Sequence, residues 1–201
     1  MSDFATYVQF GFRHIVDVEA MDHILFLLAL AAIYRWRDTK SALWVVTAFT
    51  LGHSVTLGLA VTKLVQLPTS LIEFLIPLTI VVTGLENLLT SDEQRRMRRV
   101  WYRPLIAGVF GLIHGAGFAN YLNALFVEHV ALPLFGFNVG IELGQVLILT
   151  FAAALLGGID FMLSKTRAWS ALWPAYRVRV TTVSLVIVAV ASRWAMERAP
   201  W

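Results

Sequence analysis

Cysteine is missing from the sequence altogether, and its absence excludes several kinds of chemistry at once. Without cysteine the chain forms no disulfide, binds no iron–sulfur cluster or thiolate zinc site, and has no thiol nucleophile. Methionine is also scarce, with 5 scattered residues, which disfavours copper(I). Any metal ion that this protein binds must therefore be held by nitrogen and oxygen atoms.

Charged residues are few as well. They make up 14% of the chain, 58% of the residues are hydrophobic and the mean hydropathy is +0.71, whereas a soluble domain has about 25% charged and about 45–50% apolar residues. This composition excludes an ordinary water-soluble fold. Because about 20 apolar residues cross a bilayer as a helix, we expect an all-α polytopic bundle of about six transmembrane helices, with residues 1–201 forming a single integral membrane domain.

Six apolar runs approach the length that a bilayer requires. The core of the first run is short, and the amphipathic segment from Phe4 to Ala20 leads into it. Between the fifth and sixth runs, Asp160 to Arg179 mixes aromatic with basic residues, which predicts an interfacial segment at the lipid headgroups. The six predicted spans are Met21 to Tyr34, Ser41 to Thr62, Leu71 to Leu89, Pro104 to Phe126, Leu134 to Gly157 and Val180 to Met196.

The distribution of basic residues predicts the orientation of these spans. Twelve of the 16 Lys and Arg residues fall in the first, third and fifth loops, including a tract from Asp92 to Arg103 that we interpret as a solvated loop. Because cytoplasmic loops carry an excess of Lys and Arg, the odd-numbered loops are expected to be cytoplasmic. The sequence therefore predicts a protein of the bacterial inner membrane with both termini in the periplasm.

Ionisable and polar residues within the predicted spans indicate function, because an ionisable group at membrane depth costs at least a few kcal/mol unless it is paired or hydrated. In the predicted topology most of these residues share one layer in the outer half of the membrane. Only Glu86 and Asn87 lie near the cytoplasmic end. The residues concerned are Asp22, His23, His53, Glu73, Glu86, Asn87, His114, Glu142 and Gln145.

Helical spacing places several of these residues on common faces, since positions three, four and seven apart share one side of a helix. By this rule Asn138, Glu142 and Gln145 form a polar stripe. A second stripe lies on the third span, where a proline is expected to break the helix and free backbone carbonyls. Glycines beside His53 and His114 are expected to let a neighbouring helix or a ligand approach the backbone. The second stripe consists of Glu73, Pro77, Gly84 and Asn87.

Three imidazoles with two or three carboxylates and no sulfur fit a borderline divalent ion such as Ni²⁺, Co²⁺ or Zn²⁺. A single buried His commonly bridges helices by a hydrogen bond, but three in one layer favour a metal or proton site. Asp22 either binds the metal or orients an imidazole. Glu86 and Asn87 either line a pathway or cap the third span, and Glu128 and His129 are interpreted as polar residues of an outer loop.

Five segments of the sequence resemble the HupE/UreJ family of bacterial membrane proteins. Members of that family accompany nickel hydrogenases and ureases and are regarded as nickel or cobalt permeases. The segments are DHILFLLAL from Asp22, TAFTLGHSVTLGLA from Thr47, ENLL from Glu86, GLIHGAGFA from Gly111 and GFNVGIELGQ from Gly136. The resemblance implies functional roles for Asp22, His23, His53, Glu86, Asn87, His114, Glu142 and Gln145.

His14 departs from the family pattern, in which an upstream His precedes the Asp-His pair by a shorter stretch that contains a Gly. Here seven residues separate His14 from Asp22, and Ala20 stands near the Gly position. At about 100° per residue, His14 and His23 are half a turn out of phase on one straight helix. They meet only if the segment breaks or re-enters the membrane, and we place this point near Asp17 to Ala20.

The sequence thus predicts a permease that moves a divalent metal ion, nickel first, to the cytoplasm. The predicted metal ligands are Asp22, His23, His53, His114, Glu142 and His14, and the residues predicted to line the pathway or support the ligands are Glu73, Glu86, Asn87, Asn138, Gln145 and Ser54. The alternatives are an intramembrane zinc hydrolase assisted by Ser54 or a carboxylate, a b-type haem protein, and an accessory subunit that delivers or senses metal. The expected partners are the lipid bilayer, the metal ion, and a second copy of the chain or a larger membrane complex, with no nucleic acid.

Overall fold

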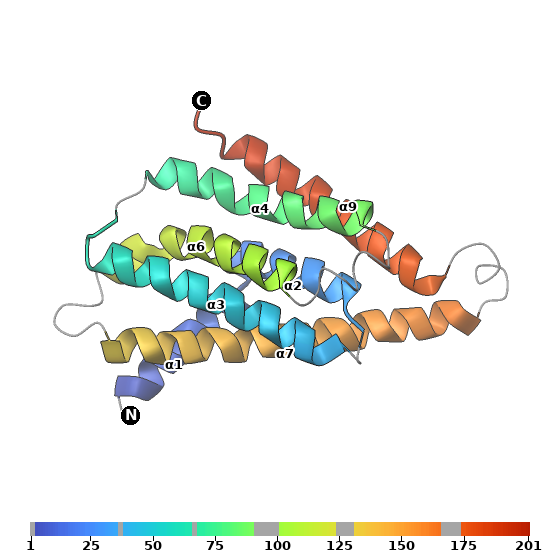
Figure 1. Cartoon of the computed structure of the whole chain (residues 1–201), viewed down its shortest axis with the longest axis horizontal. Helices are drawn as coiled ribbons and strands as arrows, with labels where there is room; N and C mark the ends of the chain where they lie inside the picture. Colours follow the sequence, from blue (N-terminus) through green and yellow to red (C-terminus); the bar gives the residue numbers. More distant parts are fainter. Residues whose placement is uncertain (1–2, 36–37, 66–67, 91–100, 124–130, 166–173) are drawn as a thin grey trace.

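The protein is all-α (Figure 1). The computed structural model describes the chain except for residues 1–2, 36–37, 66–67, 91–100, 124–130 and 166–173. Two chain-distant helix pairs, α3 with α6 and α1 with α7, make the largest contacts. The helices of the described part are α1 (Asp3–Val16), the 3-10 helix η1 (Val18–Ala20), α2 (Met21–Ile33), α3 (Thr39–Val61), α4 (Thr69–Leu89), α6 (Tyr102–Asn123), α7 (Ala131–Lys165) and α9 (Ala175–Glu197).

Four of the described helices, α3, α4, α7 and α9, are long and apolar enough to cross a membrane, and α2 is a shorter apolar helix. Large apolar side chains such as Leu51, Leu105 and Phe151 are exposed on the outside of the bundle, where a soluble protein would place polar residues. These helices bring the protein into contact with the lipid bilayer. The two termini lie at the same end of the bundle (Figure 1).

The first predicted span and its lead-in form two helices separated by a break. α1 ends at Val16, η1 follows, and α2 begins at Met21. The break coincides with the segment from Asp17 to Ala20, where we placed the break that would let His14 and His23 meet. α2 lies inside the bundle, where most of its side chains from His23 to Ile33 are buried.

Glycines explain how closely the two principal helix pairs approach. A Cβ atom on Gly111 or Gly115 of α6 would overlap the backbone of α3, and one on Gly11 or Gly140 would overlap the backbone between α1 and α7. Only the missing side chain allows such contact, as is common between membrane helices. The glycines of the sequence motifs therefore set the distance between backbones, as we expected for the residues beside His114.

α7 is longer than the predicted fifth span. Its 35 residues extend over about 52 Å at 1.5 Å per residue, and Figure 1 shows α7 continuing past α3 at the end away from the termini. The two ends of the predicted interfacial segment continue these long helices, since Asp160 lies within α7 and Arg179 within α9, and its position at the lipid headgroups stays a prediction. These two residues form a salt bridge of 2.8 Å. Trp169 and Trp173 lie outside the described residues.

Two further expectations differ from the structure. α4 is continuous from Thr69 to Leu89 with Pro77 inside it, because a proline in a helix removes one hydrogen bond without necessarily ending the helix. Arg103, assigned to a solvated loop, is buried in the first turn of α6 and contacts Glu86 of α4. Most of the loop tract itself, residues 91–100, lies outside the described residues.

Candidate metal centre

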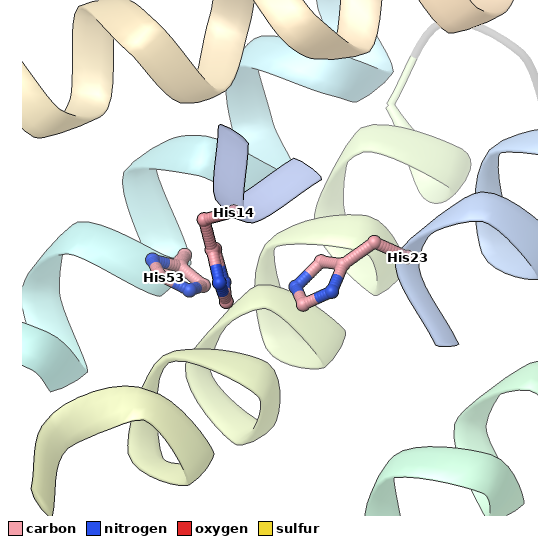
Figure 2. A group of neighbouring side chains, drawn as sticks. All are labelled: His14, His23 and His53. Atoms are coloured by element: carbon pink, nitrogen blue, oxygen red, sulfur yellow. The ribbon is translucent and has the colours of Figure 1, made fainter. Parts of the chain in front are cut away.

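Three histidines from three helices point toward one another inside the bundle (Figure 2). They are His14 of α1, His23 of α2 and His53 of α3. Each offers one ring nitrogen, and these nitrogens lie within 4.8 Å of one another. We call these residues the three-His group. His53 is fully buried and His23 is 8% exposed.

The break between α1 and α2 places the first two rings together. His14 lies in the last turn of α1 and His23 in the first turn of α2, and their ring centroids are 4.8 Å apart. The ring of Phe118 packs against His14 at a centroid distance of 3.9 Å. Because α1 and α2 are separate helices with η1 between them, the half-turn mismatch of a single straight helix does not apply.

His53 reaches the group from α3. Its ring centroid lies 6.1 Å from that of His14 and 6.3 Å from that of His23. Gly115 of α6 faces the backbone of His53, where a Cβ atom would overlap the carbonyl group. The close packing of α3 against α6 therefore fixes the depth and direction of this imidazole.

Five ring nitrogens of the three-His group are buried without a hydrogen-bond partner among the described residues. They are Nε2 of His14 and both ring nitrogens of His23 and His53. A buried polar atom without a partner costs about 1–3 kcal/mol, so proteins rarely bury several together. The arrangement instead fits a ligand that accepts nitrogen lone pairs, such as a transition-metal ion.

The spacing is close to that of a metal site. Zinc–nitrogen bonds are about 2.0–2.1 Å long, so two nitrogens that share an ion lie at most about 4.2 Å apart. The ligand nitrogens of the three-His group lie within 4.8 Å of one another, slightly more than that separation. The donor set therefore fits a divalent ion bound by imidazole nitrogen.

His114 lies beside the three-His group without being one of its members. Its ring centroid is 5.3 Å from that of His23, and its Nε2 is 3.1 Å from Oγ1 of Thr79 on α4. Its Nδ1 is buried with no hydrogen-bond partner in the described part of the chain. The structure thus brings His114 to the same place as the others, with one ring nitrogen bonded to α4.

A cavity of about 760 Å³ adjoins these histidines. His14, His23 and His114 line it, together with several charged residues. Asp22 is held there by Arg198, which donates a hydrogen bond of 3.1 Å to Oδ2, whereas Oδ1 is buried without a partner in the described residues. Glu73 is exposed and also lines the cavity. The remaining charged lining residues are Arg13 and Asp17.

The polar stripe on α7 contacts α3 rather than the three-His group. Glu142 accepts a hydrogen bond of 2.9 Å from Thr47, and Gln145 accepts one of 2.9 Å from Thr50. Asn138 has a buried Oδ1 without a partner in the described structure. Ser54 donates a hydrogen bond of 2.6 Å to the carbonyl of Thr50. Glu142 as a metal ligand stays a prediction.

Glu86 and Asn87 do not line the cavity and lie near the C-terminal end of α4. Asn87 is fully buried, and its Nδ2 donates a hydrogen bond of 2.8 Å to the carbonyl of Ala29 in α2. Arg103 contacts both residues, with its Nη2 at 3.4 Å from Glu86 Oε1 and 3.4 Å from Asn87 Oδ1. Asn87 therefore joins α4 to α2 and α6 instead of capping a helix at the solvent.

Sequence reasoning missed the partners of the predicted residues, namely Thr47, Thr50, Thr79, Arg103 and Arg198. A signal existed for the threonines of α3, because Thr47, Thr50 and His53 recur every three residues on one helix face. No local signal exists for Arg198, since its contact with Asp22 joins opposite ends of the chain.

The fold and these buried imidazoles define a multi-pass membrane protein with a histidine site inside the bundle. A family model, HupE / UreJ protein, matches residues 1–198. The chain belongs to the HupE/UreJ family, a family of transporters rather than enzymes that is associated with nickel and cobalt uptake. No curated protein and no solved structure matches the chain.

Proposed function

We propose that this protein is a permease that carries a divalent transition-metal ion, nickel first, into the cytoplasm. The observation that carries the proposal is the three-His group, in which five buried ring nitrogens have no hydrogen-bond partner among the described residues and which adjoins a polar cavity. Imidazole nitrogen favours late first-row ions over Mg²⁺ and Ca²⁺. The ion is the substrate, and His14, His23 and His53 replace part of its water shell.

The proposed direction follows from the two ends of the bundle. The cavity lies where α4 begins and α9 ends, which is also the end of the termini (Figure 1). At the other end, polar side chains hold the carbonyls of α2: Asn87 bonds to Ala29, and Tyr176 bonds to Ile33 at 2.9 Å. With both termini in the periplasm, this arrangement corresponds to a state open outward and closed inward.

We further propose six crossings. α3, α4, α6, α7 and α9 each cross once, and α1 with α2 forms one broken crossing. Transporters commonly bind substrate at such interrupted helices, where half-helices end near the membrane centre. Release to the cytoplasm requires that the contacts among Asn87, Arg103 and Glu86 open, which places these residues on the inner part of the route.

The zinc hydrolase alternative also expects a compact group of three histidines, as seen here. Membership of a transporter family favours transport over hydrolysis. An accessory role within a larger complex predicts metal binding without transport by the isolated chain. Transport by the purified protein therefore separates the proposal from that alternative.

Uptake into proteoliposomes tests the proposal. Vesicles that contain the purified protein and an internal metal-sensitive dye should accumulate Ni²⁺ or Co²⁺ faster than empty vesicles, and His53→Ala should abolish the difference. His129→Ala, which removes the one histidine predicted to lie in a loop, serves as the matched control and should retain uptake. Wild-type uptake no faster than that of empty vesicles would refute the permease.

Labelling tests the orientation. The chain has no cysteine, so Ser2→Cys introduces a single thiol at the N-terminus and Ser164→Cys a single thiol near the end of α7. A membrane-impermeant maleimide should label the first variant in intact spheroplasts and the second only after lysis. The reverse pattern would invert the proposed direction.

A further inference from the structure

Arg198 forms an ion pair with Asp22, the only acidic residue of α2. Its Nη1 lies 3.1 Å from Oδ2 of Asp22, and the side chains are 34% and 19% exposed. Both residues line the cavity that leads to His23, the sequence neighbour of Asp22. The Arg198 guanidinium is also 5.5 Å from the ring centroid of Trp194, which steadies it by a cation–π contact.

Asp22 carries its carboxylate at the start of a helix. It lies in the first turn of α2, where the positive end of the helix dipole favours a carboxylate. An ionised carboxylate at the mouth of a cation site attracts every divalent ion, and Mg²⁺ and Ca²⁺ bind through such oxygen atoms. The environment outside a cell holds these ions in excess over transition metals, so a free Asp22 would work against selectivity for nickel or cobalt.

Arginine is suited to suppress this competition. Its guanidinium stays protonated at all physiological pH values and bonds to carboxylate oxygen through a rigid set of donors. While Oδ2 is bonded to Arg198, a hard cation has to displace a fixed positive charge to use both oxygens. An ion that prefers imidazole does not have to displace Arg198, because the three-His group offers ring nitrogens without a partner among the described residues.

We propose that Arg198 is a specificity-determining residue of the metal site, which by holding Asp22 prevents Mg²⁺ and Ca²⁺ from binding beside the three-His group. This inference rests on the proposed function. It assigns the selectivity to a residue at the end of α9, a helix that carries none of the predicted ligands.

Competition binding tests this role. Co²⁺ is titrated into the purified full-length protein in detergent and followed by visible absorption, with and without excess Mg²⁺ or Ca²⁺ at constant ionic strength. The wild-type affinity for Co²⁺ should be unaffected by either ion. In Arg198→Gln, the hard ions should weaken apparent Co²⁺ binding by about tenfold, a size typical of changes at residues that support metal ligands.

Three variants complete the experiment. Arg193→Gln removes an exposed arginine of the same helix, whose partner is Glu197, and should behave as wild type. Arg198→Met gives a second neutral replacement if Arg198→Gln does not fold. Adding Asp22→Asn to the neutral variant should restore insensitivity to Mg²⁺, because the competing carboxylate is gone.

The outcomes separate the inference from the function on which it rests. If the wild type binds no Co²⁺, the proposed function fails and the inference with it. If the wild type binds Co²⁺ but neither neutral variant becomes sensitive to Mg²⁺ or Ca²⁺, the function stands and the role of Arg198 is refuted. Sensitivity that persists after Asp22→Asn also refutes it.

Discussion

Replacing His53 by Ala should weaken metal binding strongly, whereas replacing His114 by Ala should weaken it only moderately. Both imidazoles are almost fully buried, so both substitutions leave a comparable space in the bundle. They differ in their partners: His53 belongs to the three-His group and has two free ring nitrogens, but His114 is bonded to Thr79. The pair therefore separates loss of a ligand from loss of packing.

The expected loss of metal affinity follows from the number of ligands that each variant retains. Structural zinc sites with four ligands bind with about 10–16 kcal/mol, or about 3 kcal/mol per ligand, and each 1.4 kcal/mol corresponds to about tenfold in affinity. Loss of His53 from a group of three should weaken binding by about 100-fold or more. His114→Ala acts on the neighbouring His23 and should weaken binding by about tenfold at most.

Isothermal titration calorimetry of the purified variants with Ni²⁺ measures both effects. Size-exclusion chromatography shows whether each variant remains folded and monodisperse. Equal losses in the two variants would mean that packing rather than ligation explains the effect. Unchanged affinity in His53→Ala would show that the three-His group is not the binding site.

Three further expectations concern stability. Gly140→Ala should lower the free energy of unfolding by about 1–3 kcal/mol, because the added Cβ overlaps the α1 backbone. Gly158→Ala should be neutral or stabilising, because no atom lies within 4 Å of its added Cβ. Equal melting temperatures of the two variants would contradict this. Asn87→Leu should cost about 1–3 kcal/mol, since it removes the hydrogen bond to Ala29, and an unchanged melting curve would show that the bond is dispensable. Ni²⁺ at 100 times its Kd should stabilise the wild type by about 2.7 kcal/mol in a thermal-shift assay, an effect that a chelator reverses and that should be missing from His53→Ala.

Apolar runs predicted the helices well because each crossing needs its own hydrophobic length, a property of local sequence. The predicted start at Met21 and end at Leu89 agree with α2 and α4. The end of α7 was not predictable in this way. Asp160 was interpreted as the start of a polar segment, but it lies within α7 and forms a salt bridge with Arg179 of α9, a distant partner that local sequence does not reveal.

The burial of two basic residues could not be predicted from the local sequence either. Counting Arg103 and Arg179 as loop residues supports a positive-inside orientation, yet both are buried in contacts with acids. The orientation itself stays a prediction. The burial of each arginine depends on an acidic partner that sequence spacing does not reveal.

The break between α1 and α2 joins the fold to the site. Helix ends leave backbone groups unbonded, and at membrane depth these are tolerated only beside protein or a polar cavity. The cavity lies there, lined by Asp17, Ala20 and Asp22. The negative end of the α1 dipole lies near His14, where it favours a cation, and the positive end of α2 lies near the Asp22 carboxylate. One straight helix would lose both effects and separate His14 from His23, so the break itself is what makes a cation site possible at this depth.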